Sequence, residues 1–196
     1  MPSLQSIAEL SWRQIFPNPS VESPITLVEF IATARNEFAY QTLLMAWKEK
    51  RDEGEYNIPP YLLEQTKLPV INNEMDISGL NVFKSLPQEV WAVNIGGINC
   101  ICKYVKSTVN LSQLLCGDDS LDDSVRTYYF MNNKIVFPKG THTSPLTFIY
   151  ANCGDNVNGL TEVDEAIGSL VRAKLNELYI GKVGKEDVTI NQNPEN

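Results

Sequence analysis

The spacing of apolar residues predicts a long amphipathic helix in the first quarter of the chain. The helix is expected to open at Ser23-Pro24, because serine is a good N-cap and proline suits the first helical position. It is expected to run to about Arg51, where "DEGEYNIPPY" ends the pattern. Its buried stripe is predicted to contain Leu27, Ile31, Ala34, Phe38 and Met45, with Leu44 and Trp47 beside them.

Two further segments have helical spacing. A short helix is predicted over 3–16, with an apolar face of Leu4, Ile7, Ala8 and Ile15. Another is predicted from a Thr161 cap to Gly181, where a glycine is expected to end it. The buried stripe of that helix is expected to be Val163, Ile167, Leu170, Val171, Leu175 and Leu178.

Between these helices the hydrophobic period changes to two, which is typical of β-strands. Strands are predicted over 89–105, with Gly96-Gly97 as a bend, and in "PLTFIYA". "RTYYFMNNKIVFPKG" predicts a hairpin that turns at Asn132-Asn133, since asparagine tolerates the positive φ of tight turns. That register places Phe130 opposite Ile135 and Tyr128 opposite Phe137. A short helix is also expected near 60–66.

This order of elements predicts an α+β fold, a helical bundle with an inserted antiparallel β-sandwich-like block. The helical body is expected to comprise 1–88 and 156–181, and the β block 89–155, with 182–196 as a flexible C-terminal tail. The helices at opposite ends of the chain each have an apolar stripe, so they are expected to pack against each other.

Composition narrows the possible functions. The chain has 24 acidic and 16 basic residues, a net charge of -8, and no basic cluster of the kind that grips phosphates. No apolar run is long enough to span a membrane and no secretory signal is evident, so a cytosol-like compartment without membrane contact is expected.

The cysteines raise the question of a metal or redox site. In "INCICKYV", Cys100 and Cys102 would share one face of a strand, as small hydrophobes in a sheet core. The alternative is a zinc site completed by Cys116 and Cys153, but zinc sites usually take pairs separated by two to four residues. The strand-core interpretation is therefore favoured.

Other candidate chemistry is similarly weak. His142 is the only histidine, and the sequence places no acid or nucleophile beside it. "GDDSLDDS" at 117–124 has four aspartates but lacks the spacing of a calcium-binding EF-hand. We assign no catalytic, cofactor-binding or metal-binding residue, and we expect no enzyme activity and no cofactor.

Four phrases together resemble a family. They are "SPITLVEFIATARNEFAYQTLLMAWKEK", the β segments "RTYYFMNNKIVFP" and "LTFIYA", and "LTEVDEAIGSLVRAKLNELYIGK". In order and texture they are similar to the head-to-tail connector, or tail-adaptor, ring proteins of short-tailed bacteriophages, in particular crAss-like phages.

The resemblance implies a structural virion protein of the phage neck or tail, assembled in the host cytoplasm. It implies a homo-oligomeric ring, commonly twelve-fold, that connects the portal protein and other tail proteins. DNA would pass through the channel during ejection without specific binding, and an acidic wall suits that passage.

Two alternatives belong to other classes. One is a non-catalytic β-sandwich module that binds sugar or protein through Trp12, Trp47, Trp91 or the "YYF" aromatics at 128–130. The other, ranked last, is a metalloenzyme.

Overall fold

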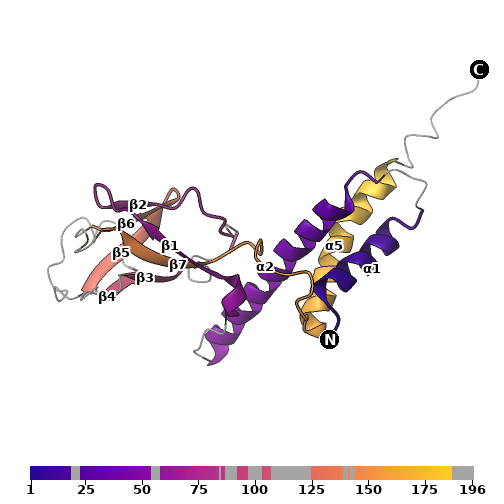
Figure 1. Ribbon diagram of the computed structural model, residues 1–196, viewed down its shortest axis with the longest axis horizontal. Helices are drawn as coiled ribbons and strands as arrows, with labels where there is room; N and C mark the ends of the chain where they lie inside the picture. Colours follow the sequence, from indigo (N-terminus) through magenta and orange to yellow (C-terminus); the bar gives the residue numbers. More distant parts are fainter. Residues whose placement is uncertain are drawn as a thin grey trace, which may run out of the picture. The chain divides into compact units, whose positions relative to one another are not determined.

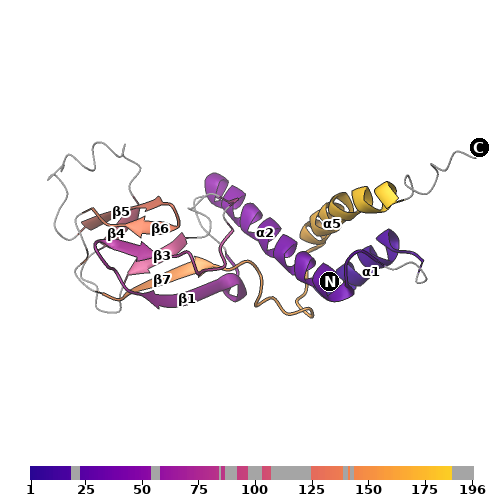
Figure 2. The ribbon, with the colours of Figure 1, turned by 90° about the horizontal axis from the view of Figure 1, so that it is seen from above.

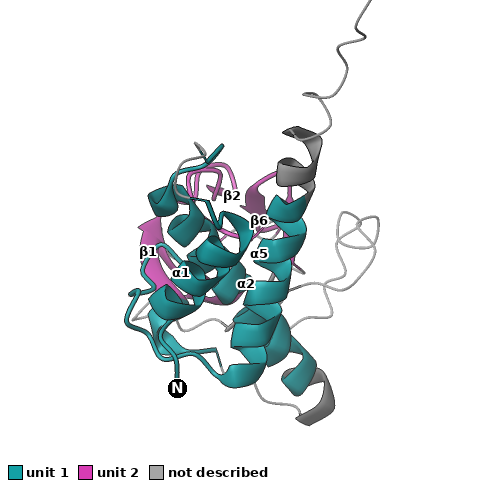
Figure 3. Ribbon diagram, turned by 90° about the vertical axis from the view of Figure 1, so that its right-hand side faces the viewer, with its two compact units in different colours: residues 1–62, 153–196 teal, residues 63–152 magenta. Residues whose placement is uncertain are grey.

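The fold is α+β, as the sequence predicts, and it divides into a helical unit and a β unit. The computed structural model describes residues 1–18, 23–53, 58–83, 85–86, 92–96, 103–106, 125–138, 141 and 144–186. The helical unit comprises 1–62 and 153–196, and the β unit comprises 63–152 (Figure 3). The β unit thus begins at Leu63 and not at 89, because two strands between 63 and 76 belong to its sheets.

The described residues of the helical unit form three helices and one short turn. The helices are α1 (Leu4–Ile15), α2 (Leu27–Glu53) and α5 (Glu165–Glu186) (Figure 1). The turn is the 3-10 segment η1 (Pro60–Leu62). Each of the three helices packs against the other two. The predicted packing of helices from opposite ends of the chain is therefore confirmed.

Helix α1 forms as predicted. Ser3 caps it, since its hydroxyl accepts a hydrogen bond from the Ser6 backbone N–H at 3.2 Å. The predicted apolar face is buried in full: Leu4, Ile7, Ala8 and Ile15.

Helix α2 begins three residues later than the expected first turn at Pro24. Thr26 and Glu29 form a reciprocal capping box: the Glu29 N–H donates to Thr26 Oγ1 at 3.2 Å, and the Thr26 N–H donates to Glu29 Oε2 at 2.9 Å. The bonds from Thr26 to the Glu29 carboxylate lower the pKa of that group. Because the box satisfies two backbone donors, it sets the start of the helix in place of the predicted Ser23 cap.

The buried face of α2 is rotated relative to the predicted stripe. Ala34 and Phe38 are buried as expected, whereas Leu27 is 39% exposed. The reason is that the core forms around Phe30, whose ring lies 5.3 Å from that of Trp12 and 5.2 Å from that of Tyr179. The remaining buried apolar residues of α2 are Ala39, Leu43 and Ala46.

Helix α5 differs from the prediction at both ends. Asp164, not Thr161, caps it, because the Ala166 N–H donates to Asp164 Oδ1 at 2.8 Å. The helix does not end at Gly181 but continues to Glu186. A glycine ends a helix by adopting a positive φ, and among the described glycines only Gly154 has one. Gly181 therefore stays helical. Val163, Val171 and Leu175 are buried as predicted, while Leu170 and Leu178 are exposed. The predicted tail beyond 186 lies outside the described residues.

Within the helical unit, residues near the N-terminus are hydrogen-bonded to the segment that precedes α5. The Leu4 N–H donates to Thr161 O at 3.0 Å and the Gln5 N–H to Gly159 O at 2.9 Å. In return, the Val163 N–H donates to Pro2 O at 3.1 Å. These bonds occupy the segment where the helix start was predicted, which explains why α5 begins only after Asp164.

The described strands of the β unit form two sheets. One is three-stranded in the order β1-β7-β3 (Figure 2). The other is four-stranded in the order β2-β6-β5-β4. Pairing is antiparallel except between β4 and β5, which run parallel. The strands are β1 (Leu63–Leu68), β2 (Glu74–Asp76), β3 (Ala92–Gly96), β4 (Lys103–Lys106), β5 (Val125–Met131), β6 (Lys134–Val136) and β7 (Leu146–Ala151).

Residues that were predicted to form a helix near 60–66 instead form η1 and β1. β1 pairs with β7 along its whole length, from Leu63 opposite Ala151 to Leu68 opposite Leu146. This cross-strand pairing, with a partner distant in the sequence, overrides the local helical pattern.

The predicted hairpin between β5 and β6 is confirmed. Asn132 and Asn133 have φ of 49° and 60°, and Phe130 pairs with Ile135. The rings of Tyr128 and Phe137 are 6.2 Å apart, as that register requires.

Replacing Asn133 tests this turn. Asn133→Gly is expected to preserve or raise stability, because glycine adopts positive φ freely, whereas Asn133→Val is expected to lower it by about 1–2 kcal/mol. Urea unfolding of the two variants measures the difference. Equal stability of the glycine and valine variants would contradict the assigned turn.

Gly154 lies where the chain returns to the helical unit and approaches α2 closely. Its φ is +84°, and a Cβ there would lie 2.7 Å from the carbonyl oxygen of Arg35 and 3.0 Å from Ala39 Cβ. Because the first contact is with backbone, relief would require the loop or the helix to shift.

We expect Gly154→Ala to destabilise the protein by about 1–3 kcal/mol, since it combines a strained φ with a backbone clash. Gly79→Ala is the matched control, because nothing lies within 4 Å of its added Cβ. Denaturant midpoints measure both, and an unchanged midpoint for Gly154→Ala would contradict the close approach.

Candidate functional site

The outer face of the four-stranded sheet has a polar group built by three strand residues. In β2 the residues alternate, so Glu74 and Asp76 point to one side while Met75 is fully buried on the other. β6 pairs Lys134 with Asp76 and Ile135 with Met75. Lys134 therefore shares the outer face with the two carboxylates, above a core that contains Met75 and Ile135.

These side chains line a hollow of about 290 Å³ in the β unit. Its remaining walls are apolar or neutral, and Ile71 among them is 65% exposed. The full lining is Pro69, Ile71, Asn72, Glu74, Asp76 and Lys134.

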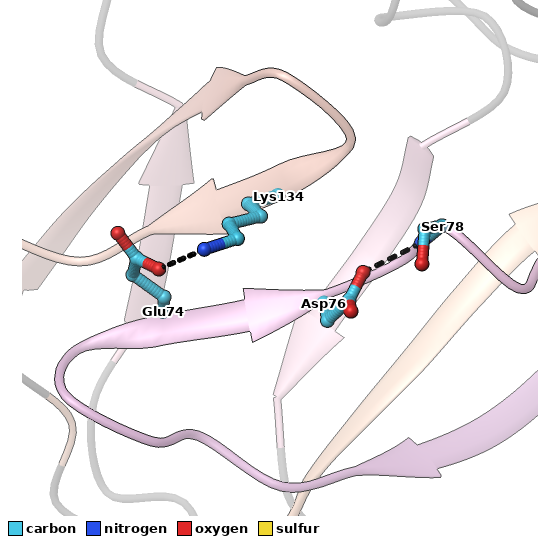
Figure 4. Close-up of polar contacts among 4 residues, drawn as sticks. All are labelled: Glu74, Asp76, Ser78 and Lys134. Atoms are coloured by element: carbon cyan, nitrogen blue, oxygen red, sulfur yellow. Dashed lines mark hydrogen bonds and ion pairs between the residues drawn. The ribbon is translucent and has the colours of Figure 1, made fainter.

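The two carboxylates of the hollow have different partners (Figure 4). Lys134 Nζ forms an ion pair with Glu74 Oε2, and this hydrogen bond, together with the attraction to Glu74, raises the pKa of Lys134. Asp76 Oδ1 instead accepts a hydrogen bond from the Ser78 backbone N–H at 2.8 Å. That bond is the main reason why the pKa of Asp76 lies below its ordinary value, with smaller contributions from the Ser78 hydroxyl and from the charge of Lys134.

Two tight turns hold the frame of the hollow. Asn72 and Asn73 adopt φ of 51° and 63°, like the asparagine pair of the β5–β6 hairpin. The Phe137 N–H donates to Asn73 O at 2.9 Å, and the Ile77 N–H donates to Asn133 O at 3.0 Å. Backbone bonds thus extend the short β2–β6 pairing at both ends, so the charged side chains are presented from a fixed framework.

Cys153 is the one candidate cysteine among the described residues, and it lies in the helical unit. Its thiol is half-buried and free. Burial, with a smaller contribution from the charge of Asp155, raises the pKa of Cys153 to about 11. At neutral pH the group is therefore a protonated thiol, which is neither a good nucleophile nor a ready zinc ligand.

The aromatic candidates that are described contribute largely to packing. Trp12 lies between helices, with its ring 4.5 Å from that of Phe16 in addition to its contact with Phe30. Tyr128 is buried, with an edge-to-face contact to Phe130 at 5.7 Å. Trp47 is half-buried.

The remaining candidates fall outside the described residues: Cys100, Cys102, Cys116, His142, Trp91 and the acidic segment 117–124. Within the described part of the chain, no group of three or more His, Cys, Asp or Glu side chains is placed to hold a metal ion.

The hollow was not predicted from the sequence. The alternation in "EMDI" was a usable signal, since it puts two carboxylates on one face of a strand and two apolar side chains on the other. The position of Lys134 depends on the pairing of β2 with β6, which joins segments far apart in the sequence and has no local signature.

No family model matches the chain, and no curated protein matches it significantly. None of the described helices has a stretch long and apolar enough to cross a membrane.

The state of Cys153 gives a test by alkylation. With a pKa of about 11, roughly one thiol in a thousand is ionised at pH 8, against about a quarter for an ordinary thiol. We expect iodoacetamide to modify Cys153 at least about tenfold more slowly in the native protein than in urea, as measured by mass spectrometry of the peptide that contains it. Equal rates would show that the thiol is not buried.

Proposed function

We propose that this chain is a structural subunit of a bacteriophage virion, forming a ring in the neck or tail between the portal and the tail and around the DNA channel. The resemblance of the helical and β phrases to tail-adaptor ring proteins suggests this role. The observation that carries it is an exposed row of apolar side chains on α5.

This row runs beside the buried one. Val171, Leu175 and Tyr179 recur every four residues and are buried in the helical unit. A second row consists of the residues that directly precede these three in the sequence. In it, Leu170 and Leu178 are 45% and 42% exposed, and Lys174 lies between them. Residues four apart lie along one side of a helix, so these three form a continuous strip, named here the α5 strip.

The α5 strip combines apolar and ionic character, which suits a contact between subunits. Lys174 pairs with Glu177 at 2.9 Å, and both side chains remain accessible, at 39% and 70%. An exposed pair of this kind contributes little to the stability of a single subunit. Repeated head-to-tail contacts through such a strip close into a ring when the rotation between subunits is right.

The charge of the chain is compatible with a channel wall. A net charge of -8 repels the phosphates of DNA, so a passing genome would not adhere. The same charge disfavours a role in holding nucleic acid, which requires a basic surface.

Charged substitutions in the α5 strip test the proposal. We expect the double variant Leu170→Lys, Leu178→Lys to fold with a melting temperature close to that of the unaltered chain, because both side chains are exposed, but to lose assembly. The measurement is mass photometry of the chain mixed with the portal protein of the same virion, where the unaltered chain should form a multi-subunit complex.

Ser169→Lys is the control, because Ser169 is exposed on α5 outside the strip and the substitution adds the same kind of charge. It is expected to assemble normally. Assembly of the double variant at the level of the unaltered chain, or no complex with the unaltered chain, would contradict the proposal.

A second candidate function is a non-catalytic binding module. The hollow in the β unit favours it, because mixed apolar and charged lining is typical of surfaces that recognise a ligand or a protein segment.

A further inference from the structure

The hollow of the β unit is charged in a way that selects its occupant. It contains two carboxylates and one ammonium, which leaves one net negative charge. The ammonium of Lys134 is engaged by Glu74, whereas Asp76 forms no ion pair with any described residue. A cationic group is therefore the occupant that would neutralise the remaining negative charge of the hollow.

The apolar wall narrows the class of cation. Ile71 is 65% exposed and stands with Pro69 at the side of the hollow, so an occupant with an aliphatic stem would cover apolar surface that now faces water. A bare metal ion would gain nothing from this wall, and two carboxylates are too few for an all-protein site of a hard cation. A long basic side chain matches both parts of the hollow.

We infer that the hollow binds an arginine side chain presented by a partner protein. A guanidinium donates two parallel hydrogen bonds to one carboxylate, and such bidentate pairs are stronger and more directional than the contact of an ammonium. Ser78 orients the Asp76 carboxylate through its backbone N–H, which donates to Oδ1, and its hydroxyl adds a second attraction. A carboxylate has about four acceptor positions, so positions remain for the two N–H donors of a guanidinium.

The framework of the hollow favours this binding without rearrangement. The two asparagine turns and the backbone bonds at Asn73 and Asn133 fix the strands that carry the carboxylates. Little ordering entropy is therefore lost when the partner side chain enters. This inference depends on the β unit alone and stands apart from the ring assembly through the α5 strip.

The test is an NMR titration of the isotope-labelled full chain with N-acetyl-arginine amide. We expect saturable shifts of the Ser78 amide and of amides in 71–76, with a Kd on the order of 1–10 mM, since a single side chain makes few contacts. N-acetyl-citrulline amide, which has the same shape without the charge, is expected to produce no saturable shifts. N-acetyl-lysine amide is expected to bind more weakly than the arginine probe.

Three variants complete the test. Asp76→Asn should weaken binding of the arginine probe about tenfold, the size expected for loss of a charge-assisted pair. Ile71→Ser, which leaves Asp76 in place, should weaken it several-fold by removing the apolar wall. Glu162→Gln, which removes an exposed carboxylate of the helical unit, should leave it unchanged.

Several results would overturn the inference. They are an absence of saturable shifts at these amides, equal binding of the citrulline or lysine probe, and unaltered affinity in both the Asp76→Asn and Ile71→Ser variants. Because Ile71 is exposed, the serine variant keeps the test decisive even where Asp76→Asn disturbs the Ser78 turn.

Discussion

The helical unit depends on hydrogen bonds that join residues 2–5 to residues 159–163. They set α1 beside the start of α5, and α2 then fills the remaining side of the three-helix core through Phe30. The cost of closing a chain segment rises only slowly with its length. The bonds between 2–5 and 159–163 can therefore form even though a large segment is inserted between α2 and α5. That segment is the β unit, residues 63–152, and the helical core remains one compact unit.

The elements that the sequence predicted well are those with strong local signals. The Asn132-Asn133 turn and the apolar face of α1 follow from positive-φ preference and helical spacing alone. The predictions were wrong where contacts outside the local segment determine the structure. The capping box of Thr26 and Glu29 sets the start of α2 in place of Ser23. The segment of β1 was predicted to be helical but forms a strand because it pairs with β7. The buried face of α2 was misjudged because Phe30 is selected by Trp12 and Tyr179, which come from two other helices.

The α5 strip and the hollow of the β unit differ in how far they could be predicted from the sequence. The α5 strip contains Leu170 and Leu178, which helical spacing predicted to be buried. A wide apolar stripe contains several rows of residues, and spacing alone does not show which row is buried and which is exposed. The hollow required the register of β2 against β6, which brings Lys134 to Asp76. Both surfaces combine apolar side chains with exposed charge, and neither requires bound metal or cofactor for the roles proposed.

We propose that the helical unit, closed by the bonds between 2–5 and 159–163, is the building block of a ring around the DNA channel. The most direct test is cryo-electron microscopy of the virion that contains this chain. We expect repeated copies in a ring at the portal–tail junction, with the α5 strip, including Leu170 and Leu178, covered by the adjacent subunit. A virion without this chain, or a ring in which the strip faces solvent in every copy, would contradict it.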